Sequence, residues 1–242
     1  MRFKESLTES INDKGILKAV FMAGHPGAGK SYVISKVKAG GIEPRIFSAD
    51  TWTEFLKVGN NKDWEQLKSK IKNISIGQMT NNINSMLPVF VDGTSANSTR
   101  IFVRDAILEK FGYDSMMIWV NTSLETALKR AEEREKKIGR HVDPDFIRKA
   151  YETVNKLKPI YKSHFKHFIE VNNDEGELTD KAILKAFRKT TGFFMSPIKN
   201  KKGQGIVEKM RENGWKYLSD GIMDKNEIKS SLDLWFKYSS RY

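Results

Sequence analysis

Short apolar runs alternate with longer segments of helical periodicity over most of the chain. Such runs are typical of strands buried on both faces, and the segments between them are typical of amphipathic helices. The predicted strands are 16–23, 45–48, 89–91, 116–120 and 168–171. The predicted helices are 30–37, 51–87 with a break near 59–61, 98–111 capped by Asn97 or Ser98, and two between the fourth and fifth strands, joined at 139–142. This alternation predicts an α/β fold, with a parallel sheet of about five strands and helices on both faces.

The first predicted strand ends in a glycine loop that matches the pattern G-x-x-x-x-G-K-[ST] in full. The loop consists of Gly24, His25, Pro26, Gly27, Ala28, Gly29, Lys30 and Ser31, and Tyr32 follows it. In a strand–loop–helix context, backbone N–H groups of this pattern converge on phosphate oxygens, helped by the positive end of the helix. We therefore expect a P-loop NTPase fold in which 24–32 bind ATP. A turn without a ligand is the alternative.

Particular roles follow for three side chains of the loop. Lys30 is expected to reach the β- and γ-phosphates, and the Ser31 hydroxyl is expected to ligate Mg²⁺. His25 occupies one of the unspecified positions of the pattern, so we expect it to be a bystander rather than a catalyst.

Two aspartates follow predicted strands at the carboxyl edge of the sheet, where ligands of such folds bind. Asp50 comes after the second strand and is placed to accept the proton of an acceptor hydroxyl, its alternative role being a helix N-cap. Asp92 comes after the third strand and is expected to hold Mg²⁺ directly or through water. Its alternative is a turn aspartate before Gly93.

A cation-rich helical lid is predicted over 129–142. Arg130 and Arg134 are four residues apart, hence on one helical face, and Arg140 follows a glycine on the connection to the next helix. We expect at least one of the three arginines to stabilise charge on the transferring phosphoryl group. The alternative is a solvated helix whose cations pair with Glu132, Glu133 and Glu135.

The C-terminal quarter carries most of the excess positive charge. The net charge is +12, from 42 Lys and Arg against 30 Asp and Glu. Residues 181–242 hold 14 basic and 6 acidic side chains, a surplus of eight. Such a surplus favours a polyanionic partner, although a merely solvated basic surface is the alternative.

A turn-rich segment, 191–197, is predicted to separate a kinase domain, 1–190, from a small basic helical module, 193–242. Lys199, Lys201 and Lys202, flanking an expected turn at Gly203, are the predicted nucleic-acid contacts. Aromatic side chains of this module are expected to form its own core rather than to stack on bases. They are Trp215, Trp235 and Phe236.

Composition excludes several other classes of site and location. The chain has no cysteine, so disulfides, thiolate metal sites and cysteine nucleophiles are excluded. No run approaches the ~18 apolar residues that span a bilayer, and we expect a cytoplasmic protein, in the host cytoplasm if viral, with no membrane partner. The oligomeric state is left open.

With these pieces placed, residues from about 16 to 175 resemble the zeta-toxin and polynucleotide-kinase branch of P-loop kinases, found in bacteria and bacteriophages. The resemblance is carried by 24–31, 47–50, 91–94 and 120–130. It implies that Asp50 is the general base and that a lid arginine contacts the phosphates. The same branch includes phage kinases that phosphorylate 5-hydroxymethyluracil in DNA.

These observations predict an ATP-dependent kinase that transfers the γ-phosphoryl group to a hydroxyl of a nucleic acid, either the 5′-OH of DNA or RNA or a 5-hydroxymethyl base. The alternative is a small-molecule kinase acting on a nucleoside, a nucleotide or, as zeta toxins do, a UDP-amino sugar. Only the basic tail separates these two hypotheses. A nucleotide-dependent switch or ATPase is less favoured, because Asp50 would then lack a purpose.

Overall fold

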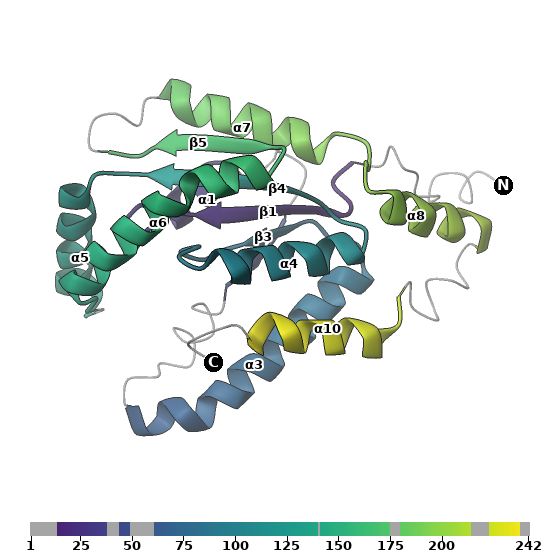
Figure 1. Ribbon diagram of the computed structural model, residues 1–242, viewed down its shortest axis with the longest axis horizontal. Coiled ribbons are helices and arrows are strands. Elements are labelled where there is room, and N and C mark those ends of the chain that lie inside the picture. Colours follow the sequence, from purple (N-terminus) through teal and green to yellow (C-terminus); the bar gives the residue numbers. More distant parts are fainter. Residues whose placement is uncertain are drawn as a thin grey trace.

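The computed structural model describes residues 14–37, 44–48, 61–139, 141–174, 180–213 and 223–237 (Figure 1). The strands are β1 (Lys18–Ala23), β2 (Arg45–Phe47), β3 (Val89–Val91), β4 (Asp114–Asn121) and β5 (Phe168–Asn172). The helices are α1 (Lys30–Val37), α3 (Asn61–Asn84), α4 (Ser98–Lys110), α5 (Leu124–Ile138), α6 (Pro144–His164), α7 (Asp180–Phe194), α8 (Lys201–Asn213) and α10 (Lys225–Lys237). None of these described helices has an apolar stretch long enough to span a bilayer.

The five strands form one parallel sheet in the order β2-β3-β1-β4-β5. All six residues of the central strand β1 are buried, as expected for a parallel sheet covered on both faces. Its side chains alternate between two apolar layers. Ala19, Phe21 and Ala23 join the layer formed with α3, α4, α6, α8 and α10, whereas Val20 and Met22 join the layer formed with α1 and α7. The predicted α/β fold is confirmed.

Most predicted elements lie within two residues of their observed bounds. Helix α1 covers 30–37 as predicted, and Asn97 caps α4 by accepting a hydrogen bond from the Arg100 backbone N–H at 2.9 Å. The fourth strand starts at Asp114, two residues before the apolar run. The polar residues Asp114 and Ser115 extend this strand because they pair in parallel register with Lys18 and Ala19 of β1.

The segment predicted to be a turn over 191–197 is helical in its first half. Helix α7 continues to Phe194, and the chain turns only from Met195 onward. Phe193 and Phe194 are buried, and the Phe194 ring lies 5.9 Å from that of Phe90 in β3. Burial of these rings therefore outweighs the turn signals of the local sequence. The predicted boundary between residues 190 and 193 falls inside this helix.

The C-terminal helices do not build a core of their own. Trp235 and Phe236 of α10 are buried, and their rings lie 5.5 and 6.3 Å from that of Phe47 in β2. Helix α10 packs along α3 and α4 (Figure 1), and α8 adds Ile206 and Val207 to the same layer. The prediction of a separate core is therefore wrong for Trp235 and Phe236, whereas Trp215 lies outside the described residues.

Gly203 does not form the expected turn but lies in the first turn of α8. A Cβ added there would lie 2.3 Å from the carbonyl oxygen of Gly112, which ends the segment after α4. The close backbone contact explains why glycine stands at this position of the helix.

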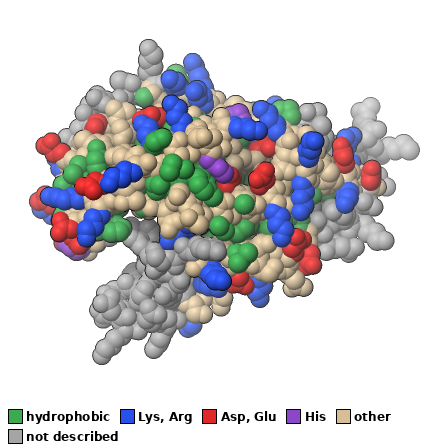
Figure 2. Space-filling model, viewed as in Figure 1, with side chains coloured by type: hydrophobic (Ala, Val, Ile, Leu, Met, Phe, Trp, Pro, Cys, Tyr) green, Lys and Arg blue, Asp and Glu red, His purple; other side chains and the backbone are tan. Residues whose placement is uncertain are grey.

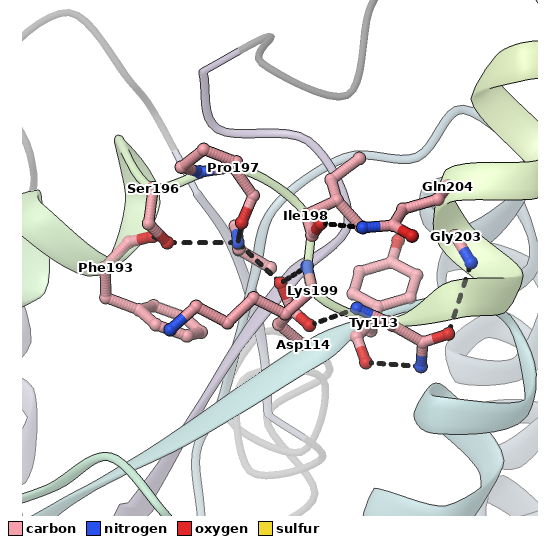
Figure 3. A network of polar contacts seen from close by, with 11 residues as sticks. Tyr113, Asp114, Phe193, Ser196, Pro197, Ile198, Lys199, Gly203 and Gln204 are labelled. Atoms are coloured by element: carbon pink, nitrogen blue, oxygen red, sulfur yellow. Dashed lines mark hydrogen bonds and ion pairs between the residues drawn. The ribbon is translucent and has the colours of Figure 1, made fainter.

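A buried ion pair ties the segment after α7 to the amino ends of β1 and β4 (Figure 3). The Nζ atom of Lys18, whose side chain is fully buried, lies 2.6 Å from Asp114 Oδ2 and also donates to Ser196 Oγ and the Pro197 carbonyl. Asp114 in turn accepts from the backbone N–H groups of Lys199 and Asn200, at 2.9 and 2.8 Å. Burial lowers the pKa of Lys18, against the opposing effect of Asp114.

Removal of Asp114 should therefore destabilise the fold strongly. Asp114→Ala leaves the Lys18 ammonium buried without its partner, and we expect the free energy of unfolding to fall by about 3 kcal/mol. Asp233→Ala is the matched control, because the Asp233 carboxylate pairs with Lys72 on the surface and should cost less than about 1 kcal/mol. Urea unfolding measures both. Similar losses in the two variants would contradict a structural role for the Lys18–Asp114 pair.

Candidate active site

The glycine loop lies between β1 and α1, with its backbone pressed against neighbouring elements. Gly27 has φ +82°, and a Cβ added to it would lie 2.5 Å from the Ala127 carbonyl oxygen of α5. Gly29 has φ +86°, and its Cβ would lie 2.1 Å from Asn173 Nδ2, just beyond β5. Side chains are excluded at both positions, so the loop can present its backbone closely to a phosphate chain, as the sequence pattern predicts.

Lys30 is the first residue of α1, and its side chain lies over the loop. The Nζ atom donates to the Gly24 carbonyl at 2.8 Å and to the His25 carbonyl at 3.3 Å. The ammonium group is thus held at the centre of the loop rather than in bulk water. Ser31 and Tyr32 are exposed on the first turn of α1, and the Tyr32 ring lies 5.4 Å from Lys36 Nζ.

His25 is buried and holds the loop against the carboxyl end of β4. Its Nδ1 lies 3.0 Å from the Pro26 carbonyl oxygen and its Nε2 lies 3.1 Å from that of Thr122. The ring packs edge-on against Tyr151 of α6 at 4.9 Å, and burial lowers the pKa of His25. These contacts are those of a residue that shapes the loop, and they agree with the expectation that His25 is not the catalyst.

Asp92 and Ser31 are the two predicted ligands of Mg²⁺. Asp92 follows β3, and its backbone N–H donates to the Phe47 carbonyl of β2 at 2.9 Å. In the described part of the chain, no three His, Asp or Glu side chains gather into a metal site. Mg²⁺ is commonly held by one or two protein oxygens together with phosphates and water, so a hydroxyl and a carboxylate at this edge fit that ion when phosphates are bound.

Asp50 and Arg140, two further predicted site residues, lie outside the described residues. The structure does describe β2, whose last residue Phe47 pairs in register with Val91 of β3. Strand β2 therefore ends beside the strand that carries Asp92, at the carboxyl edge of the sheet. The role of Asp50 stays a prediction.

Arg130 connects the lid helix to the loop. Its Nη2 donates to the Asn173 carbonyl at 2.8 Å and its Nη1 reaches the Gly27 carbonyl at 3.5 Å. Arg134 makes no such contact with the loop among the described residues and is half-buried. The alternative of a solvated helix applies to part of the lid, where Glu132 pairs with the lid cation Lys136 on the surface, and Glu135 pairs with His141.

The two lid arginines should differ in their effect on activity. Arg130→Ala removes a guanidinium that lies at the loop, and we expect kcat to fall about tenfold or more. Arg134→Ala, on the same helix face, should change kcat by less than about threefold because its side chain does not reach the loop. Steady-state kinetics of both variants tests whether Arg130→Ala loses more kcat than Arg134→Ala. A larger loss in Arg134→Ala would move the phosphate contact to that residue.

Asn173, which the sequence analysis missed, holds the glycine loop by a hydrogen bond to its backbone. Its Nδ2 donates to the Ala28 carbonyl at 2.6 Å, and its own carbonyl accepts from Arg130 and from Thr122 Oγ1. The side chain is buried. Asn173 thus joins the loop, the lid helix and β4 in one network. A signal existed, since Asn172, Asn173 and Asp174 form a polar run directly after a predicted strand at the ligand edge.

Asp174, the next residue, fixes the start of the lid helix. Its Oδ1 accepts from Thr122 Oγ1 and from the Ser123 N–H, each at 2.8 Å. Partial burial acts to raise the pKa of Asp174, but the hydrogen bonds from Ser123, Thr122 and Thr126 outweigh it and lower the pKa to about 2. The carboxylate is therefore ionised over the physiological range and holds the first turn of α5.

Stability should depend on this carboxylate only above a defined pH. Because the pKa of Asp174 is lower in the folded chain than its ordinary 3.8, its contribution is full above about pH 4 and is lost as the pH falls toward about 2. Asp174→Asn should lower the free energy of unfolding by no more than about 1 kcal/mol at pH 7, because solvent screens a half-buried charge.

This difference between wild type and Asp174→Asn should shrink between about pH 4 and pH 2 in urea unfolding. The exposed change Asp233→Asn serves as control. A difference that stays constant over this range would mean that the charge of Asp174 is not what stabilises the start of α5.

The three predicted nucleic-acid contacts lie far from the loop. Lys199, Lys201 and Lys202 are exposed, and the Lys199 backbone bonds to Asp114 at the amino end of β4. The eight residues of β4 separate its two ends by about 23 Å at the usual rise per residue. Figure 1 shows α8 at the right of the molecule and α5 at the left, near the loop. Nucleic-acid binding by these lysines stays a prediction, but they do not line the active site.

We compared the chain with family models, curated proteins and solved structures, and only the solved structures gave matches. No family model matches the sequence, and no curated protein matches it. A solved protein from Chloroflexus aurantiacus assigned as a kinase is 15% identical, covers 72% of this chain and 97% of its own, and has a TM-score of 0.52. A structure from the PezAT toxin–antitoxin system of Streptococcus pneumoniae is 19% identical, covers 88% of this chain and 92% of its own, and has a TM-score of 0.46. Shikimate kinase from Acinetobacter baumannii is 17% identical, covers 72% of this chain and 91% of its own, and has a TM-score of 0.43.

The identities of these three proteins are low, and of the three only the first exceeds a TM-score of 0.5. The similarity therefore speaks to the fold and not to the substrate. The chain has the fold of the P-loop kinases.

Proposed function

We propose that the chain is an ATP-dependent kinase that transfers the γ-phosphoryl group to a hydroxyl. The observation that carries this proposal is the placement of Lys30 over a complete glycine loop to which Arg130 is attached from the lid helix. Two cations of this kind, held at one loop, suit the charge that spreads over a transferring phosphoryl group. A switch or ATPase would not require a proton acceptor such as Asp50.

Each residue of the site has a distinct task in this proposal. ATP would supply the phosphoryl group, and Mg²⁺, held by Ser31 and Asp92, would neutralise phosphate charge. Lys30 binds the phosphate chain, and Arg130 stabilises charge from the lid side. Asp50 accepts the proton of the acceptor hydroxyl.

We further propose that the acceptor is a small molecule rather than a nucleic acid. The nucleic-acid hypothesis depended on the basic tail, and its predicted contacts, Lys199, Lys201 and Lys202, lie at the opposite end of the sheet from the loop. These three lysines therefore give no support for a strand bound across the active site. The resemblance to zeta toxins points to a nucleoside, a nucleotide or a UDP-amino sugar, and membership of that branch is part of this proposal.

Incubation with γ-labelled ATP and a panel of acceptors tests both statements. The panel contains nucleosides, nucleotides, UDP-amino sugars, 5′-OH DNA, 5′-OH RNA and hydroxymethyluracil DNA, with Lys30→Ala protein as the control. We expect label on a small acceptor and none with the variant. Label on DNA or RNA would restore the nucleic-acid kinase, and ATP hydrolysis alone with every acceptor would favour the ATPase.

A further inference from the structure

A pocket lies at the amino ends of β4 and β5, at the opposite end of the sheet from the glycine loop. It has a volume of about 330 Å³ and opens between the start of β5 and the end of α7. The size is within the range of small-ligand pockets. The proposed kinase reaction uses none of its residues.

The polar lining of this pocket is cationic. Lys166 and His167 precede β5, Lys189 comes from α7, and Lys199 comes from the segment before α8. Figure 2 shows Lys and Arg side chains along this edge of the molecule, over α7 and toward α8. No aspartate or glutamate lines the pocket. Among the described residues, no carboxylate pairs with the side chain of Lys166, Lys189 or Lys199.

Asp114, whose charge acts on His167 of the lining, is already occupied. Asp114 bonds to Lys18 Nζ and to the backbone N–H groups of Lys199 and Asn200. These bonds fix the point from which the Lys199 side chain leaves the backbone, as Figure 3 shows. Three lysines from three separate segments are thus brought to one cavity, and no carboxylate of the described residues pairs with them. A bound anion would balance their charge.

The remaining lining indicates what the anion is attached to. Phe193 and Phe168 contribute aromatic side chains, and Met116 and Ile169 contribute aliphatic ones. The His167 and Phe193 rings lie 5.6 Å apart. A cationic rim above an apolar wall favours a phosphate carried on a flat organic group over a bare inorganic ion.

We propose that this pocket, which we call the basal pocket and define by Lys166, His167, Lys189, Phe193 and Lys199, binds a nucleotide phosphate at a site separate from the active site. The phosphate contacts the three lysines and His167, and the base lies against Phe168, the half-buried aromatic side chain of the lining. The phosphate belongs either to a free mononucleotide or to a residue of a nucleic-acid strand, and the two sources have the same chemistry.

The pKa of His167 should report phosphate binding in the basal pocket. Partial burial lowers its pKa, and Lys199, Lys18 and Lys166 lower it further, while Asp114 opposes them. The imidazole is therefore mainly neutral at pH 7 in the free protein. A phosphate dianion in the basal pocket favours the imidazolium, so binding should raise the pKa of His167, take up protons and strengthen as the pH falls.

The test is an NMR pH titration of the histidine side chains of the full chain, with and without AMP as the probe. The chain has four histidines, and His167→Gln assigns the signal. We expect saturating AMP to raise the pKa of His167 by about half a unit or more, with the same response in Lys30→Ala protein, whose active site is altered. An unchanged pKa of His167, or a response lost in Lys30→Ala, would overturn the proposal.

A matched pair of triple variants separates the pocket from general charge. Lys166→Gln/Lys189→Gln/Lys199→Gln should weaken AMP binding at this site about tenfold or more, whereas Lys185→Gln/Lys225→Gln/Lys229→Gln, with the same net charge, should bind as the wild type. If both triple variants lost AMP affinity equally, the effect would come from net charge, and the proposed site would be contradicted. A deoxythymidine dodecamer then distinguishes the sources. Binding much tighter than AMP and lost in the first triple assigns the phosphate to a strand, and binding no tighter assigns it to a free nucleotide.

Discussion

Lys30→Ala should lower kcat by at least a factor of about a hundred while leaving the fold intact. The Nζ atom donates to the carbonyl oxygens of Gly24 and His25, so its removal takes no apolar side chain from the core. What is lost is a cation positioned where negative charge develops on the transferring phosphoryl group, and such contacts are worth about 3 kcal/mol. Steady-state phosphoryl transfer and circular dichroism together measure the two effects.

Lys36→Ala is the matched control for this variant. Lys36 lies on the same helix, α1, but is exposed, and its removal should leave kcat within about twofold of wild type, as expected for a surface position. Activity of Lys30→Ala within about threefold of wild type would contradict the assignment of the loop as the catalytic centre.

Asp50→Asn should lower kcat about 10²–10⁴-fold and leave ATP affinity largely unchanged. The amide keeps the size of the carboxylate but cannot accept the proton of the acceptor hydroxyl. The described end of β2, beside Asp92, makes this region of the sheet the expected place for such a base. Turnover and ATP binding are measured on the same preparation.

The alternative role of Asp50 predicts a different result. Asparagine caps helices about as well as aspartate, so a residue that only caps should tolerate this change. Near-normal turnover would therefore assign Asp50 to capping. Asp233→Asn, an exposed change of the same type, controls for the loss of one negative charge.

The strands and the loop could be predicted because their signals are local. Val89, Phe90 and Val91 are apolar, bounded by Pro88 and Asp92, and all three are buried in β3 as the pattern indicates. The glycine loop is likewise recognised from eight consecutive residues. The residues that follow the other strands are expected near this loop, because the carboxyl ends of parallel strands lie at the same edge of the sheet.

The partners of the C-terminal helices could not be predicted in this way. An apolar stripe shows that a helix is buried, but not against which element. Trp235 and Phe236 pack on Phe47, nearly 190 positions away along the chain, and the tail consequently belongs to the main core. Asn173 was missed for a related reason, because its function depends on contacts with Ala28 and Arg130 that no local pattern encodes.

The central claim, that the glycine loop binds a nucleoside triphosphate for phosphoryl transfer, is tested most directly by calorimetric titration of the full chain with ATP and Mg²⁺. We expect one Mg²⁺-dependent ATP site per chain, which binds ATP more weakly when Mg²⁺ is omitted and about tenfold more weakly in Lys30→Ala, because that side chain is held over the loop. Competition with AMP should leave this heat signal largely intact, since AMP lacks the β- and γ-phosphates. Absence of ATP binding, or equal affinity in wild type and Lys30→Ala, would contradict the account.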